Sequence, residues 1–298
     1  MATNSTATVQ QIFAASVLHT MGELKEMGLK NFAERRTQEG GESIDFMRYK
    51  GGEAKDGVPS MYDTSKDEET SNGGEFKKFT ATIAPISSQD KPTWEQINKT
   101  KLDIKNTIFT SLTRAIVKKE DAKILAAIVT ADSKLNKVGA ITLDPTTLEF
   151  AQLLLAEVRD CLVSAEFTPD GKKGVALVMN RLDYKRMSTS EAFINGDFKN
   201  SITGGDNNLP LSFGGAEIFV TDDKNVPTGT AFIIPSNSFG FGEWEGSVKP
   251  FAKFVDDDGM RWHLQVVKSI GVVVIEGNFI TKVTMKPNEN TRPELSSL

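Results

Sequence analysis

The chain contains few of the residue types that perform catalysis or bind metal ions. Its only cysteine is Cys161, and its two histidines, His19 and His263, lie far apart in the sequence. Zinc sites made of Cys and His ligands, and triads centred on a histidine, are therefore disfavoured. Cys161 follows Leu154 and Val158 at spacings of seven and three residues, so we predict that it packs in a helix core. His263 lies in a strand-like run and is expected to be structural.

Three short fragments resemble ligand-binding motifs, and each lacks a residue that the motif requires. The run Gly171-Lys172-Lys173-Gly174 has neither the earlier glycine nor the following Ser or Thr of a phosphate-binding loop. Gly240-Phe241-Gly242 lacks the third glycine of a dinucleotide-binding turn, because that position is Glu245. A calcium loop centred on Asp256-Asp257-Asp258-Gly259 would place Phe254 at its first ligand position. We therefore predict no catalytic residue, no cofactor-binding residue, no metal ligand and no cofactor, and we expect that the chain is not an enzyme.

Composition narrows the class of protein further. The 298 residues include 35 Lys and Arg against 40 Asp and Glu, a net charge of −5, and 39 % are hydrophobic, which is enough for a folded core. The negative charge disfavours a broad basic face that grips phosphate backbones. No Lys or Arg precedes Lys25, and the apolar run 270–275 is too short to span a bilayer. We expect a soluble protein that is made inside the cell.

The N-terminal third holds a predicted helix and a long hairpin. Hydrophobic spacing predicts an amphipathic helix over 9–27 that stops at Gly28, with an apolar stripe formed by Val9, Ile12, Phe13, Val17, Met21 and Leu24. Alternating segments at 43–49 and 78–83 predict the two arms of a β-hairpin. The polar residues 51–74 between them offer little apolar surface to pack on their own domain. We therefore favour an arm that becomes ordered on a partner over a floppy loop.

The rest of the chain mixes helices and strands without a regular alternation. Thr93 and Gln96 after Pro92 form a capping box, and apolar spacing predicts a long helix from there to about residue 129. Asp144-Pro145 predicts the start of a second helix, with Asp144 as its N-cap. We expect a short helix at 182–187, a loop-rich stretch at 188–215, and strands at 175–179, 216–221, 231–235, 249–255, 260–267, 270–275 and 279–285. This order predicts an α+β fold.

The order of these parts resembles that of the major capsid proteins of tailed bacteriophages, which share the fold named after phage Hong Kong 97. Local sequence supports the resemblance. The runs that look like the spine helix of podovirus-type coat proteins are Leu102-Asp103-Ile104-Lys105, Thr113-Arg114-Ala115-Ile116 and Lys119-Glu120-Asp121-Ala122. The stretch that resembles the closing strands of the peripheral domain includes Met260-Arg261-Trp262, Gln265 and residues 270–275.

This resemblance implies a Hong Kong 97-like capsid fold divided into named parts. The implied parts are an N-terminal arm at 1–35, an extended loop at 36–92, the spine helix with the first part of the peripheral domain at 93–180, an axial domain at 181–230, and the closing strands of the peripheral domain with a C-terminal tail at 231–298. Because only about 35 residues precede the extended loop, we expect no N-terminal scaffolding segment, and hence a separate scaffolding protein.

The resemblance also implies a function and a set of partners. It implies a coat protein that self-assembles into the icosahedral head of a tailed dsDNA bacteriophage, made in the cytoplasm of a host bacterium and located in the virion. The implied partners are other copies of the chain in hexamers and pentamers, a scaffolding protein, a portal and non-specifically packaged dsDNA. A decoration protein is an optional further partner, and no membrane is implied. The alternatives are an encapsulin-like nanocompartment shell and, from another class, a soluble α+β ligand-binding protein or enzyme.

Overall fold

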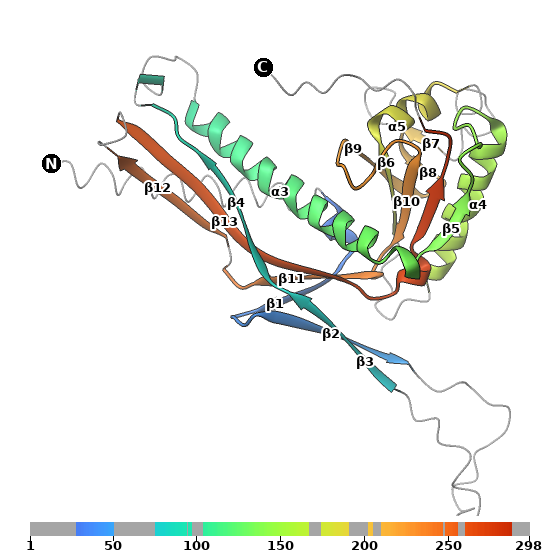
Figure 1. Ribbon diagram of the computed structural model, residues 1–298, viewed down its shortest axis with the longest axis horizontal. Coiled ribbons are helices and arrows are strands. Elements are labelled where there is room, and N and C mark those ends of the chain that lie inside the picture. Colours follow the sequence, from blue (N-terminus) through green and yellow to red (C-terminus); the bar gives the residue numbers. More distant parts are fainter. Residues whose placement is uncertain are drawn as a thin grey trace, which may run out of the picture.

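The helices and strands form two units, and a hairpin projects from them (Figure 1). The computed structural model describes residues 28–50, 75–93, 95–96, 104–166, 174–190, 202–204, 210–246, 248–255 and 260–287. The α+β class is confirmed. The predicted helix at 9–27, the polar segment 51–74, the lysines of the glycine-lysine run and the aspartate turn at 256–259 lie outside the described residues.

The first unit is a five-stranded sheet covered by one long helix. Strand β13 lies at its centre: it pairs antiparallel with β12 and then β11 along one edge and with β4 along the other, and β1 adds to β11 in parallel. The strands are β1 (Glu34–Gln38), β4 (Ala84–Asp90), β11 (Phe239–Trp244), β12 (Lys249–Val255) and β13 (Arg261–Val274). The helix α3 (Ile104–Thr130) runs along β4 and β13 (Figure 1).

Helix α3 buries a stripe that repeats every fourth residue. Its 27 residues span about 40 Å at ~1.5 Å per residue. The stripe consists of Leu112, Ile116, Glu120, Ile124 and Ile128, all at most 4 % exposed. An acidic side chain therefore occupies the middle of an otherwise apolar face that packs on the sheet.

The predicted capping box after Pro92 is confirmed. The backbone N–H of Thr93 donates to Gln96 Oε1 at 2.9 Å, and the N–H of Gln96 donates to Thr93 Oγ1 at 3.2 Å. These reciprocal bonds satisfy two backbone donors at a helix start. Residues 97–103, between this box and α3, lie outside the described residues.

The second unit is a seven-stranded sheet in the order β5-β14-β10-β6-β9-β8-β7, with α4 (Leu148–Glu166) on one face and α5 (Arg181–Ser188) after β6. Its strands are β5 (Asn136–Gly139), β6 (Val175–Asn180), β7 (Ile202–Gly204), β8 (Pro210–Phe213), β9 (Ala216–Thr221), β10 (Thr230–Pro235) and β14 (Thr281–Thr284). The range 181–230, expected for the axial domain, contains α5 and β7–β9 but leaves out β6 and β10 in the middle of the same sheet.

The fold also includes three short 3₁₀ helices: η1 (Leu29–Phe32), η3 (Asp132–Lys134) and η5 (Gly277–Phe279).

The hairpin consists of β2 (Ser43–Lys50) and β3 (Glu75–Thr82) and forms a sheet of its own. Its antiparallel register runs from Ser43 opposite Thr82 to Lys50 opposite Glu75, so the predicted hairpin arms are confirmed.

The predicted start of the second helix is wrong by three residues. Helix α4 begins at Leu148, and Thr147 is its N-cap: the Thr147 carbonyl accepts the first helical bond, and its Oγ1 accepts from the N–H of Phe150. Asp144 instead holds the turn before the helix, because its Oδ1 accepts from the N–H and the hydroxyl of Thr146.

The predicted strands at 260–267 and 270–275 are one continuous strand, β13. The sequence suggests a break because Lys268 and Ser269 interrupt the apolar pattern. Both residues are buried, at 4 % and 7 % exposed, and the charge of Lys268 is compensated by two carboxylates. A charge that is paired inside the fold therefore made a 14-residue strand resemble two shorter ones.

Candidate assembly surface

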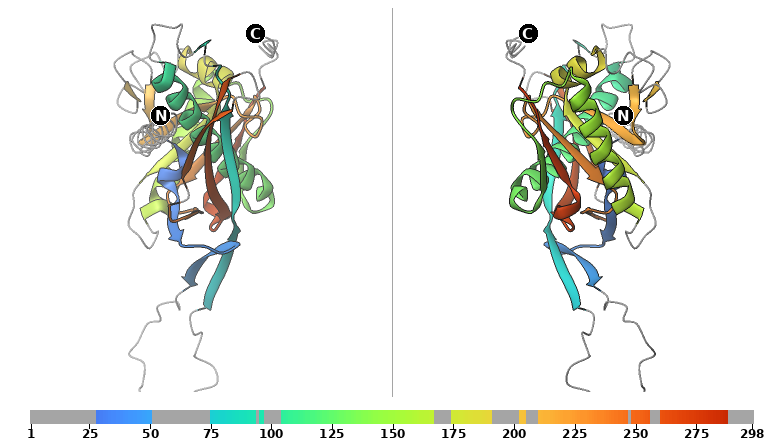
Figure 2. Two further views of the ribbon diagram at one scale, coloured as in Figure 1. Left: turned by 90° about the vertical axis from the view of Figure 1, so that its left-hand side faces the viewer. Right: turned by 90° about the vertical axis from the view of Figure 1, so that its right-hand side faces the viewer.

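The β2–β3 hairpin projects from the rest of the fold. Both side views in Figure 2 and the view in Figure 1 show it projecting beyond the two units. An isolated two-stranded hairpin is marginally stable in water, so its described part depends on contacts at its base. Some residues anchor the hairpin at its base. Other side chains stay exposed and are available for contact with another molecule.

Glycines on the first unit make room for the base of the hairpin. A Cβ added at Gly240 would lie 2.7 Å from the ring of Phe46, and one at Gly242 would lie 2.8 Å from the Cδ1 of Ile44. Phe46 and Ile44 are 0 % and 3 % exposed. The Gly240-Phe241-Gly242 run thus lies in a strand rather than in a phosphate-binding turn, and it allows the hairpin to pack closely on β11.

Gly271 on β13 allows a similar approach from the other arm. A Cβ at this position would lie 2.8 Å from the backbone oxygen of Thr82, at the end of β3. Backbone atoms cannot move aside as a flexible side chain can, so the close packing of β3 on β13 requires glycine here.

Charged contacts also tie β2 to the first unit. The Arg48 guanidinium lies 3.0 Å from Glu34 Oε2 on β1 and donates to the backbone oxygen of Asn237 at 3.0 Å. The side chains of Arg48 and Glu34 are only 13 % and 11 % exposed, which strengthens their attraction relative to a surface pair. The guanidinium of Arg36 lies 5.5 Å from the centre of the Phe46 ring. The base of the hairpin is therefore held by apolar and charged contacts together.

The opposite face of the hairpin carries apolar side chains that are exposed to solvent. Met47 is 53 % exposed and Phe76 is 69 % exposed. They are diagonal neighbours on one face, because Met47 lies opposite Lys78, two residues from Phe76. The same face carries the ion pair of Lys78 with Asp45 at 2.9 Å, and hydrogen bonds from Lys78 and Thr80 lower the pKa of Asp45. Exposed large apolar groups on a projecting element are typical of an interaction surface.

A network of four alternating charges, three of them buried, joins the segments around α3. Glu120, which is fully buried, accepts from Lys30 Nζ at 2.9 Å and from Lys268 Nζ at 2.6 Å, and Lys268 also lies 2.6 Å from Glu243. Burial by itself lowers the pKa of Lys268, but the attraction of Glu120 and Glu243 outweighs it and raises that pKa above its usual range. These ion pairs link η1, α3, β13 and β11.

The next residue of α3, Asp121, holds the start of the described chain. Its Oδ1 accepts from the backbone N–H of Leu29 at 2.9 Å, and a Cβ at Gly28 would lie 3.1 Å from the same atom. Burial raises the pKa of Asp121 to about 6, although the Leu29 hydrogen bond opposes this shift. Gly28 has a φ of 122°, a conformation that favours glycine, and it marks the predicted end of the N-terminal helix.

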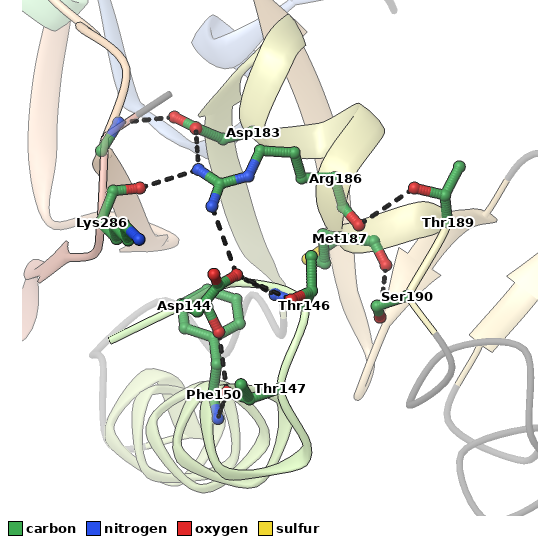
Figure 3. A network of polar contacts seen from close by, with 11 residues as sticks. Asp144, Thr146, Thr147, Phe150, Asp183, Arg186, Met187, Thr189, Ser190 and Lys286 are labelled. Carbon is green, nitrogen blue, oxygen red and sulfur yellow. Dashed lines mark hydrogen bonds and ion pairs between the residues drawn. The ribbon is translucent and has the colours of Figure 1, made fainter. Parts of the chain in front are cut away.

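A second polar network holds the parts of the seven-stranded unit together (Figure 3). The guanidinium of Arg186 on α5 donates to the backbone oxygen of Lys286 at 2.9 Å and to Asp144 Oδ1 at 3.2 Å. It also lies 3.9 Å from Asp183, whose other oxygen accepts from the Gly229 N–H at 2.7 Å. These contacts connect α5 to the turn before α4, the loop before β10 and the segment after β14, so the network is structural.

The residues that we examined for chemistry have structural positions. Cys161 is 2 % exposed in the core of the second unit, as predicted, and burial raises the pKa of its thiol to about 11. His263 lies half-buried on β13. Within the described ranges, no three His, Cys, Asp or Glu side chains are grouped so that they could hold a metal ion. In the same part of the chain, no helix is long and apolar enough to cross a membrane.

Sequence reasoning missed the ion network of Glu120 and the part that Gly240, Gly242 and Gly271 play in the packing of the hairpin on the first unit. Glu120 could have been found, because it lies four residues from both Ile116 and Ile124, where an uncompensated charge would be costly. Its partners could not be identified, because Lys30 and Lys268 are 90 and 148 residues away in the sequence.

Comparison with known proteins identifies the family. The family model described as phage capsid protein matches residues 81–277, well over half of the chain. The chain belongs to the phage capsid protein family. This capsid protein has no match among curated protein sequences. The predicted major capsid protein is thereby confirmed, and such a protein is a component of the virion.

The fold of the capsid protein is shared by solved shell structures. The capsid of cyanophage P-SCSP1u matches with a TM-score of 0.61 at 11 % identity, covering 86 % of this chain and 87 % of that one. The capsid of Ralstonia phage GP4 matches at 0.57 and 11 %, covering 88 % and 89 %. The virus-like particle from Pyrococcus furiosus matches at 0.57 and 15 %, covering 90 % and 96 %. Identities this low show the fold alone, and the Hong Kong 97-like fold is confirmed.

Proposed function

We propose that the capsid protein self-assembles into the icosahedral head of a tailed dsDNA bacteriophage, and that the β2–β3 hairpin carries a principal contact between neighbouring copies. The supporting observation is the exposed pair Met47 and Phe76 on a projecting element whose base is firmly packed. A second copy that covers this face would remove both side chains from water. A stable interface buries roughly 1,200–2,000 Å², and a projecting hairpin helps a subunit reach such areas on several neighbours.

The remaining partners belong to this proposal. Copies of the chain form hexamers and pentamers, a separate scaffolding protein guides their assembly, and a portal occupies one position in the shell. A decoration protein can add to the outside. The net charge of −5 favours a container that holds dsDNA without gripping it, because strong phosphate binding would oppose release of the genome. In this role the chain acts as a structural protein and not as an enzyme, with production in the cytoplasm of a host bacterium.

The two units correspond, in this proposal, to the two domains of the family. The unit of α3 and the five-stranded sheet is the peripheral domain. The unit of the seven-stranded sheet, α4 and α5 is the axial domain, whose loops meet at the centre of a capsomer. This division follows the sheets and therefore assigns β6 and β10 to the axial domain.

A double substitution on the hairpin tests the proposal. In the variant Met47→Ser with Phe76→Ser, the base contacts remain, so we expect a folded subunit with a native circular dichroism spectrum. Negative-stain microscopy, with and without the scaffolding protein, should show loss of shells. The matched control is Ile141→Ser, which removes a side chain that is also 69 % exposed but lies on the other unit. Shells formed by the double variant at wild-type yield would overturn the role of this face.

A further inference from the structure

A cavity of about 450 Å³ lies where the two units meet. Its apolar wall consists of Leu29, Ala122, Leu125, Val178, Phe219 and Val220. Thr221 and four charged residues, Lys118, Asp121, Asp222 and Asp223, complete the lining. Val220 is 43 % exposed, whereas Leu29, Leu125 and Val178 are almost fully buried. The site is thus a hollow between α3 and β9 with both apolar and charged lining groups, and its size is that of a typical binding cavity.

The described chain begins at the edge of this cavity. Leu29 lines it, and Gly28 lies against Asp121, another lining residue. The start is held by the Leu29 N–H bond to Asp121 and by the buried pair of Lys30 with Glu120. The segment before Gly28 is therefore tethered at the edge of the cavity.

We propose that the segment before Gly28 packs its apolar side chains into this cavity in the same chain. Val17, Met21 and Leu24 follow one another at spacings of four and three residues, so on the predicted helix they share one face. The side chains on that face are apolar, so they can pack against the apolar wall of the cavity.

The same chain is favoured over a second copy because of tethering. A segment joined directly to the cavity edge has an effective concentration on the order of millimolar for a short connection. A segment from another subunit at micromolar concentration competes poorly with it. Docking in the same chain also does not depend on shell formation, so it holds for the unassembled subunit.

Thiol labelling tests this docking in the full-length, unassembled chain. The natural Cys161 is buried and the pKa of its thiol is raised to about 11, so it gives little background. In a Val220→Cys variant, we expect modification by a maleimide about tenfold slower than in Val163→Cys, an exposed position on α4. A tenfold protection corresponds to ~1.4 kcal/mol of docking free energy.

Substitutions on the N-terminal segment provide the matched comparison. Adding Met21→Asp and Leu24→Asp to the Val220→Cys variant should raise its labelling rate to that of Val163→Cys. Adding His19→Asp, on the opposite face of the predicted helix, should leave the rate low. Equal rates in all these variants would overturn the proposal.

Two further measurements cover the remaining outcomes. Because Val220→Cys itself changes the cavity wall, Leu24→Cys and His19→Cys are also labelled in a chain with an intact cavity, and Leu24→Cys should react about tenfold more slowly. Protection that is independent of protein concentration supports docking in the same chain. Protection that disappears on dilution would show that a second copy fills the cavity, and would overturn the proposal.

Discussion

At the scale of single residues, Glu120 carries the greatest structural consequence. Its carboxylate is fully buried between two ammonium groups that come from opposite ends of the sequence. Replacing one member of a buried ion pair leaves an uncompensated charge, and that typically costs more than the pair itself contributes.

We predict that Glu120→Gln lowers the free energy of unfolding by about 3–5 kcal/mol, because it leaves Lys30 and Lys268 buried without their shared carboxylate. Urea unfolding followed by circular dichroism measures the change. The control is Glu217→Gln on β9, which is exposed and should change stability by less than about 0.5 kcal/mol. A loss below about 1 kcal/mol for Glu120→Gln would contradict the buried ion network as a main source of stability.

The charge of Asp121 affects stability in the opposite direction to that of Glu120, and its effect depends on pH. Its pKa is raised to about 6 from a usual 3.8, so the folded state binds a proton more tightly than the unfolded state. Its contribution therefore favours folding at low pH, and this benefit is lost as the pH rises from about 4 to about 6. Asp121→Asn removes the ionisation but keeps an oxygen to accept from Leu29.

We expect Asp121→Asn to be more stable than the parent chain at pH 7, by up to about 3 kcal/mol, and no more stable near pH 4. Urea midpoints at the two pH values measure this difference. Asp160→Asn, an exposed position on α4, controls for the loss of one negative charge. A stability advantage that grows as the pH falls would refute the assigned sign.

At the scale of elements, close packing between strands positions the hairpin. Gly271 approaches the backbone of β3 within a distance that no side chain tolerates. Gly240 and Gly242 lie equally close to the side chains of Phe46 and Ile44. Close packing at these three positions therefore holds the base of the hairpin against the sheet.

We predict that Gly271→Ala destabilises the fold by about 1–3 kcal/mol, since the new methyl group meets the Thr82 carbonyl and either strand must shift. Thermal unfolding measures the stability, and microscopy measures assembly, which should also decrease as the hairpin moves. Gly40→Ala is the control, because no atom lies within 4 Å of its added Cβ. Equal melting temperatures for the two variants would show that the close approach does not matter.

The elements also show what sequence patterns can and cannot predict. Periodicity found the hairpin arms, the strand at 175–179 and the short helix at 182–187. In each of these elements the apolar pattern is carried by residues that are close together in the sequence. It missed β1, which is entirely polar, and β11, in which two glycines interrupt the strand pattern. It divided β13 at Lys268, because the compensating Glu120 lies 148 residues away. Local rules fail where a distant partner changes the cost of burial.

At the scale of the whole molecule, the hairpin separates folding from association. Its base belongs to the subunit core, whereas its outer face with Met47 and Phe76 contributes nothing to that core. Stability and assembly should therefore respond to different substitutions. This separation is what a subunit needs if it must fold before it joins a shell.

We predict that deleting residues 53–72 leaves the subunit folded, with a melting temperature within a few degrees of the parent chain, but unable to form shells. The deletion spares β2, β3 and every contact at the hairpin base. Size-exclusion chromatography and negative-stain microscopy compare the two proteins in the presence of the scaffolding protein. Normal particles from the deletion variant would show that this segment is dispensable for assembly.

The chain of charges around Glu120 also sets an order of events during synthesis. Lys30 and Glu120 leave the ribosome long before Lys268, which is 148 residues after Glu120. At roughly 5–20 residues per second, Glu120 waits on the order of 10 s for its second partner. Until then neither the central strand nor the full charge compensation exists, so the first unit cannot close. We therefore expect that a nascent subunit cannot complete its first unit until almost the entire polypeptide has been translated.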